Sequence, residues 1–184
     1  MKSIPLSSLQ IVISFIFIMI FVTSCARESV QNAPSRDGMP DQESWGVNII
    51  LTDQGIIRAK VSSGHLEKYN EKEFIILDSS VIVDFYDHKE QHTSVLYSDK
   101  AEVDQRSNDM KAIGNVVAVS DSGITLFSDN LIWDSKGERL HTKEEIMITT
   151  PEADTLYGVG FESDSDLKNW KIINPSGVTG RGLK

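Results

Sequence analysis

Histidines and carboxylates are the residues of this chain whose types could perform acid–base catalysis or bind a metal. The four histidines are His65, His88, His92 and His141. None lies in an HExxH-type string or beside a second residue at metal-ligand spacing, and the acids fall on expected turns, where Asp has a conformational role. The sequence also has no Gly-x-Ser-x-Gly string and no phosphate-binding glycine loop. We therefore predict no catalytic residue, no metal site and no cofactor.

Cys25 is the only cysteine, and its setting predicts a covalent modification. Lys2 precedes an apolar run at 11–22, and two small residues separate that run from the cysteine. These features make a secretory signal. The string resembles a bacterial lipobox, which implies cleavage before Cys25 and a diacylglycerol on its Sγ. The alternative is an uncleaved anchor helix, but a span needs about 20 apolar residues. We predict a lipoprotein signal peptide over residues 1–24.

The charge of the chain excludes one class of partner. The first 24 residues carry one lysine and no acid, so the remaining 160 hold 17 basic and 27 acidic residues, a net charge of −10. Nucleic-acid affinity comes largely from Lys and Arg, so we expect no nucleic-acid partner. An acidic surface is also repelled by anionic headgroups, so any membrane attachment would come from the lipid on Cys25.

The predicted β-strands, which would position any functional residues, begin after a polar segment. Residues 25–45 contain Pro34, Gly38 and Pro40 and little apolar content, which predicts a lipidated, flexible linker. From 46 to 175 apolar residues alternate with polar ones, as in Val81, Val83 and Phe85, and Asx- or Gly-containing turns separate the runs. We therefore predict one all-β domain over 46–175 and a flexible tail over 176–184.

The strands also repeat at a step of thirty residues. Three apolar columns and one Asp column follow this step: Leu96, Leu126 and Leu156; Ala101, Leu131 and Phe161; Met110, Leu140 and Trp170; and Asp104, Asp134 and Asp164. Repetition of a unit that cannot bury its apolar face alone indicates stacked hairpins around a shared core. The alternative is coincidence within an ordinary meander of similar hairpins.

Several short strings together resemble a known family. In chain order they are Gly55-Ile-Ile-Arg-Ala59, Ala101-Glu-Val-Asp104, the segment from Met110 to Val119, Gly123-Ile-Thr-Leu126, the segment from Ser128 to Asp134, Leu140-His-Thr142, and the segment from Leu156 to Asp164. Their order and spacing resemble the LptC branch of the OstA-like family, over roughly residues 46–175. That branch comprises periplasmic components of lipopolysaccharide export.

The resemblance implies a V-shaped, antiparallel β-jellyroll whose apolar interior carries lipid A acyl chains. It also implies attachment at the inner membrane of a Gram-negative bacterium, receipt of lipopolysaccharide from an ABC transporter and relay to an LptA-like periplasmic jellyroll. The well-known members keep an uncleaved N-terminal helix, so the lipobox-like string is a departure. The expected lining residues are the inward members of the repeat: Leu96, Ala101, Val103, Leu126, Leu131, Trp133, Leu140 and Phe161.

The partner edge is expected at the C-terminal end of the domain. We predict a last strand at 167–173, ended by Asn174-Pro-Ser-Gly177, with Leu167, Trp170 and Ile172 at its open edge. An open edge can accept a strand from another β protein. The competing hypothesis is a structural lipoprotein adaptor that joins β proteins edge to edge and binds no lipid. An enzymatic function is not favoured.

Overall fold

The computed structural model describes residues 38–179, which form eleven β-strands. Within this range there is no helix long and apolar enough to cross a membrane. The strands are β1 (Gln42–Asp53), β2 (Ile56–Tyr69), β3 (Phe74–Asp78), β4 (Val81–Tyr86), β5 (His92–Ser98), β6 (Lys100–Asp104), β7 (Met110–Ser120), β8 (Thr125–Asp134), β9 (Arg139–Thr149), β10 (Thr155–Asp164) and β11 (Lys171–Thr179). The all-β prediction is confirmed.

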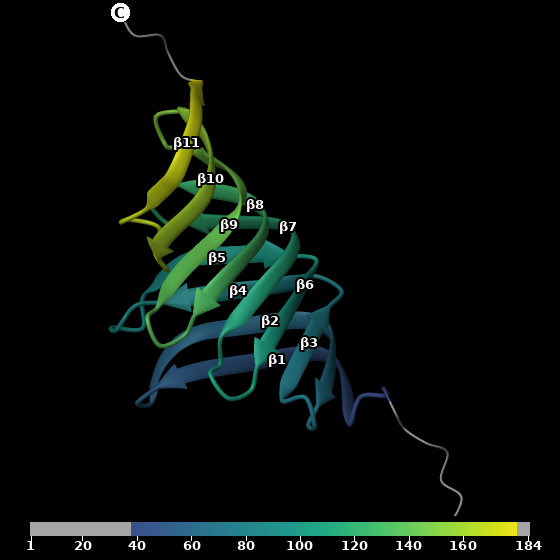
Figure 1. The fold of residues 1–184 in the computed structure, drawn as a ribbon. Helices are drawn as coiled ribbons and strands as arrows, with labels where there is room; N and C mark the ends of the chain where they lie inside the picture. The colour runs from purple at the N-terminus through teal and green to yellow at the C-terminus, as the bar shows by residue number, and fades with distance from the viewer. Residues whose placement is uncertain (1–37, 180–184) are drawn as a thin grey trace, which may run out of the picture. The chain divides into compact units, whose positions relative to one another are not determined.

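All strand pairs are antiparallel, and the two terminal strands lie at opposite ends of the stack (Figure 1). The order is β11-β10-β9-β8-β7-β5-β4-β2-β3-β6, with β1 beside β2 and a further pairing of β7 with β6. β1 pairs with β2 alone and β11 with β10 alone. Each therefore leaves one edge without a strand partner among the described residues.

Two long strands divide the sheet into two layers. The first half of β2 pairs with β4 and its second half with β3. In the same way, the first half of β7 pairs with β6 and its second half with β5. We call the layer that contains β4 and β5 layer A, and the layer that contains β3 and β6 layer B. Both layers continue into β8–β10, where breaks in register separate the two halves of each strand pair.

The bend between the layers uses backbone that few residues adopt. Gly114 in β7 has φ of +78°, and a Cβ there would lie 2.7 Å from Asp99 Oδ2. The next residue, Asn115, also has positive φ (48°) and donates a hydrogen bond to the same oxygen at 2.8 Å. Glycine and asparagine are the residues that tolerate this conformation. The pair therefore lets β7 pass from one layer to the other.

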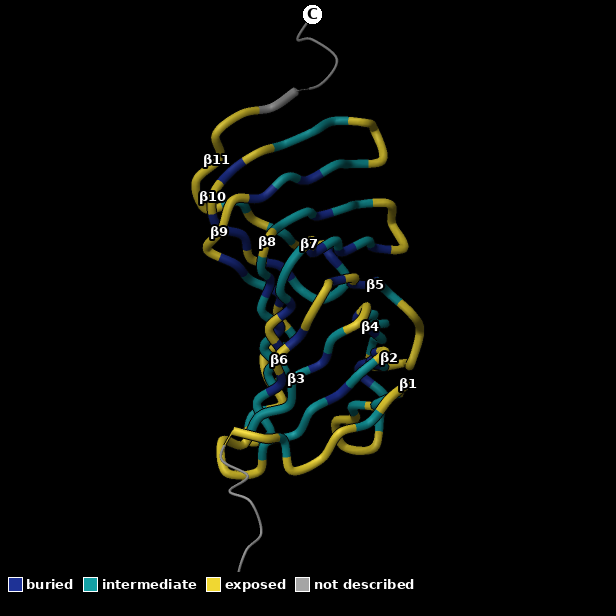
Figure 2. Tube along the Cα trace, turned by 90° about the vertical axis from the view of Figure 1, so that its right-hand side faces the viewer, coloured by how far each residue is buried: buried dark blue, intermediate teal, exposed yellow. Residues whose placement is uncertain are grey.

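The alternation of residue types in the sequence corresponds to alternating buried and partly exposed side chains along the strands. Val81, Val83 and Phe85 in β4 are buried, whereas the residues between them are only partly so. Period-two patterning gives each strand one inward face because successive side chains point to opposite sides. Figure 2 shows buried positions recurring along the strands, with exposed residues gathered mainly at the turns.

The thirty-residue repeat corresponds to rows that run across the sheet. Leu96 pairs with Ala118, Ala118 with Leu126, Leu126 with Ile148, and Ile148 with Leu156. A second row joins Ala101, Ala112 and Leu131, and a third joins Met110, Trp133 and Leu140. The Leu column therefore falls on one row throughout, whereas the other two columns share a row only through their first two members, because Phe161 pairs with Thr142 and Trp170 precedes β11.

The Asp column also has one structural role. Asp104 accepts hydrogen bonds from the backbone N–H of Arg106 and Ser107, and Asp134 accepts them from Lys136 and Gly137. These bonds lower the pKa of Asp104 because they favour the ionised carboxylate. The repeated aspartates thus close the turns at the end of layer B.

Three expected boundaries differ from the structure. β1 begins at Gln42, inside the segment expected to be a linker to residue 45. β11 spans Lys171–Thr179 and so passes through Asn174-Pro-Ser-Gly177, which we expected to end it. The strand also extends into the expected tail at 176–184. Proline at 175 is compatible with β11 because an edge strand can lack one ladder donor. Residues 1–37, with Cys25 and the predicted signal peptide over residues 1–24, lie outside the described part.

Candidate functional site

The candidate site is the apolar interior between layers A and B. All eight residues expected to line it are buried and belong to one apolar cluster: Leu96, Ala101, Val103, Leu126, Leu131, Trp133, Leu140 and Phe161. They come from β5, β6, β8, β9 and β10, so several hairpins contribute to one shared surface. In this structure the side chains of the two layers pack on each other, and the interior forms the core of the domain.

The two layers meet at the ends of their hairpins. Phe85 from layer A and Trp133 from layer B are in edge-to-face contact, with ring centroids 5.4 Å apart. The Ser94 hydroxyl of β5 donates a hydrogen bond to the carbonyl of Ser165 in the β10–β11 link. Leu167 from the same link is fully buried in the core. We call this boundary of the interior, where the hairpin ends meet, the mouth.

A charged clasp closes one part of the mouth. Arg58 at the start of β2 forms an ion pair with Glu138 of the β8–β9 turn, and its side chain is only 8% exposed. Arg58 Nη1 also lies 2.8 Å from His88 Nδ1, and His88 Nε2 lies 3.6 Å from Glu138. Arg58 and His88 belong to layer A and Glu138 to layer B. The clasp therefore connects the layers through one buried cation.

Beside the clasp lies a cavity of 320 Å³ that both layers line. Its lining includes Arg58 and Trp133, each with one buried N–H donor that has no acceptor in the described part of the chain, Nε and Nε1 respectively. A buried donor without a partner costs about 1–3 kcal/mol. The closed mouth therefore leaves two donors that an oxygen-bearing ligand could satisfy if the layers separated there.

Removal of Glu138 tests the clasp. Glu138→Ala is expected to lower the free energy of unfolding by about 2 kcal/mol, because it leaves the Arg58 guanidinium buried without its counter-charge. This loss of unfolding free energy is smaller than the loss expected on breaking a fully buried ion pair, since the Glu138 side chain is 27% exposed. In the double variant Arg58→Met, Glu138→Ala no charge is left buried, so we expect most of the loss to be recovered. Urea unfolding measures both, and a double variant no more stable than the single one would contradict the clasp.

The C-terminal edge differs in detail from the prediction. Leu167 precedes β11 and its side chain is buried, so it is not available at the edge. Trp170 and Ile172 are partly buried against the core. Ile172 pairs with Phe161 of β10, and Ile173 is 44% exposed. The accessible part of this edge is therefore the backbone of β11 from Lys171 onward.

Asp164 fixes the link that leads into this edge. Burial disfavours its ionised form, but hydrogen bonds from the side chain and backbone of Asn169 and from the Ser163 hydroxyl favour it, and its pKa is lowered to about 2. The backbone N–H groups of Lys168 and Asn169 each lie 3.1 Å from Asp164 Oδ1. The carboxylate is therefore ionised at neutral pH and holds the β10–β11 link in place.

Two side-chain clusters were missed by the sequence analysis. The Arg58, His88 and Glu138 cluster joins residues far apart in the chain, and no local pattern identifies it. The second cluster contains His65 and Glu67, two residues apart in β2. Residues at i and i+2 of a strand share a face, so this spacing could have identified the pair as neighbours.

These features define a class: a two-layered antiparallel β-jellyroll with an apolar interior and, within residues 38–179, an edge without a strand partner at each end. Comparison with known proteins gives the family. Residues 11–180 match the family described as lipopolysaccharide-assembly, LptC-related, and the chain belongs to it. No curated protein sequence matches the chain.

A solved structure supports the fold. The crystal structure of LptH from Pseudomonas aeruginosa, described as the LptA-homologous periplasmic component of a lipopolysaccharide transport device, aligns with a TM-score of 0.51 and 10% identity. The alignment covers 67% of this chain and 95% of LptH. At this identity the likeness concerns the fold, and it confirms the jellyroll expected from the sequence.

Proposed function

We propose that this protein is a membrane-anchored periplasmic component of lipopolysaccharide export that binds lipopolysaccharide without covalent chemistry. It receives the lipid from an inner-membrane ABC transporter and relays it to an LptA-like jellyroll. Family membership supports a role in lipopolysaccharide assembly. The observation that carries the binding step is the single apolar interior shared by two layers. The layers meet at the mouth through contacts that include the Phe85–Trp133 ring pair and the Arg58–Glu138 ion pair.

Acyl chains would enter where the layers separate at the mouth. Each Å² of apolar surface removed from water contributes about 25 cal/mol, so long acyl chains can replace the contacts that the two layers make with each other. The unpartnered N–H donors of Arg58 and Trp133 favour a ligand with acceptor oxygens near its chains. Binding therefore replaces apolar contacts between the two layers with apolar contacts between each layer and the acyl chains.

Lipid binding separates this proposal from the adaptor hypothesis. The purified protein is mixed with lipopolysaccharide, or with a diacyl phospholipid as the control lipid, and analysed by native mass spectrometry. A transport component is expected to form a complex with lipopolysaccharide in preference to the control. A chain that binds its LptA-like partner and forms no lipid complex would be an adaptor.

The anchor is tested at Cys25. Cys25→Ala removes the only thiol that could carry a diacylglycerol, so we expect loss of metabolic palmitate labelling and accumulation of the uncleaved precursor. Cys25→Ser is the closest control for side-chain size and should behave in the same way. If either variant matures and fractionates with membranes as the parent does, the lipobox interpretation is wrong.

A further inference from the structure

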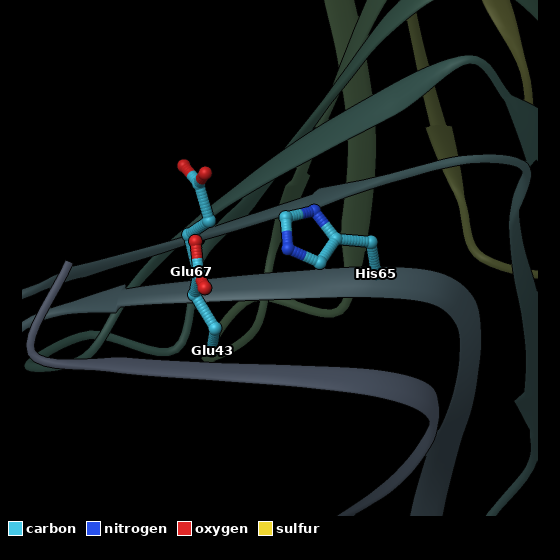
Figure 3. Close-up of side chains that lie close together, drawn as sticks. All are labelled: Glu43, His65 and Glu67. Atoms are coloured by element: carbon cyan, nitrogen blue, oxygen red, sulfur yellow. The ribbon is translucent and has the colours of Figure 1, made fainter. Parts of the chain in front are cut away.

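Glu43, His65 and Glu67 form a cluster at the N-terminal end of the sheet, away from the interior. One potential ligand atom from each residue lies within 4.8 Å of the other two. Glu43 pairs directly with Glu67 across β1 and β2, and His65 lies two residues before Glu67. Figure 3 shows the three side chains on these neighbouring strands, with one nitrogen of the His65 ring turned toward the glutamates.

Residues outside the cluster hold it in a ligand-like arrangement. His65 Nδ1 lies 3.2 Å from Asp78 Oδ1 on β3, so Nε2 is left for another partner. A carboxylate that receives the second ring N–H is the usual outer support of a metal-binding histidine. The Tyr69 hydroxyl donates to Glu67 Oε2 at 2.9 Å, and Trp45 lies against the imidazole at 5.3 Å.

The charges of the cluster favour a cation. Like charges directly opposite each other on a strand pair are destabilising. Glu43 and Glu67 are such a pair, and within residues 38–179 neither forms an ion pair with Lys or Arg. A bound divalent cation would remove the repulsion.

We propose that Glu43, His65 and Glu67 bind a divalent transition-metal ion, with Zn²⁺ as the best match. One imidazole nitrogen and two carboxylate oxygens are ligands that Zn²⁺ accepts, and a water would complete a four-coordinate site. The ligands come from β1 and β2, so the ion would fasten the terminal strand β1 to the sheet. The site is independent of lipid binding and extends beyond the proposed function.

Zinc titration of the metal-free full chain tests the site. By isothermal calorimetry with ZnCl₂ we expect one equivalent of saturable binding and a higher unfolding temperature. His65→Ala and Glu67→Gln should each weaken binding at least tenfold. Asp78→Asn, which alters only the outer support, should weaken it by about 10-fold to 100-fold. His141→Ala is the matched control, because it removes a histidine from another strand, and it should bind as the parent does.

Two further readouts make the result decisive. Co²⁺ in place of Zn²⁺ should give the visible absorption of a four-coordinate ion in the parent and not in His65→Ala. Metal binding releases protons from its ligands, so zinc affinity should be lower in acidic than in neutral buffer. Absence of saturable binding in the parent, or equal binding by His65→Ala, would overturn the proposal. Neither result would affect the lipid-binding test.

Discussion

A photoreactive aromatic residue at position 133 is expected to cross-link strongly to lipopolysaccharide, whereas the same residue at 132 or 134 should give little product. Trp133 is 3% exposed, faces the interior and meets Phe85 where the two layers join at the mouth. It is therefore among the first interior side chains that an entering acyl chain would contact. A photoreactive phenylalanine derivative preserves the aromatic bulk of this position, so the domain should still fold.

The flanking positions are matched controls. Ile132 and Asp134 belong to the same strand and the same end of the mouth, but neighbouring residues of a strand point to opposite faces. Both are only partly buried, and Asp134 accepts backbone hydrogen bonds in the β8–β9 turn. We expect an adduct yield at 133 at least several-fold above that at 132 and 134, measured by immunoblot against the lipid. Equal yields at the three positions would contradict an interior route.

The interior could be predicted from the sequence because it follows local rules. Alternation in Val81, Val83 and Phe85 identifies an inward face, and the thirty-residue step of Leu96, Leu126 and Leu156 identifies equivalent positions of stacked hairpins. Both signals depend on residues of one strand or one repeat. Register is fixed by the same patterning, because a one-residue shift would turn every apolar side chain outward.

The mouth could not be predicted in this way. Arg58 and Glu138 are brought together by the approach of two layers, and neither residue lies in a pattern that indicates a long-range partner. Leu167 shows the same limit: it lies in a polar link, yet it is fully buried in the core. Local alternation predicts which strand face points inward, but not which turn residues fold back over the end of a layer.

The end of β11 was placed too early for a related reason. Asn174-Pro-Ser-Gly177 has turn composition. An edge strand, however, pairs on one side only, so about half of its backbone N–H and C=O groups need no partner in the sheet. Pro175 pairs with Gly158 and has no N–H to donate to β10. N–H groups alternate in direction along an antiparallel strand. We therefore infer that the N–H groups of Lys171 and Ile173, in the same register as Pro175, point toward the free edge.

Lys171→Pro is accordingly expected to weaken binding of the proposed LptA-like partner about tenfold and to leave folding intact. Proline removes the outward N–H that a docking strand would use, a loss of about 1 kcal/mol, and its ring adds steric hindrance at the same place. Lys171 is the first residue of β11, a position where a sheet tolerates proline. The ladder between β10 and β11 should therefore remain, and lipid binding and the unfolding temperature should match those of the parent.

Lys171→Ala distinguishes the contribution of the backbone N–H at this position from that of the side chain. It removes the same charge and the same exposed side chain as the proline variant but keeps the N–H, so it should bind the partner with the affinity of the parent. Surface-immobilised partner and purified chain provide the measurement. If the proline variant binds as tightly as the alanine variant, the docking strand does not use this part of β11. If both variants lose affinity equally, the partner recognises the lysine side chain, and strand addition at this edge is wrong.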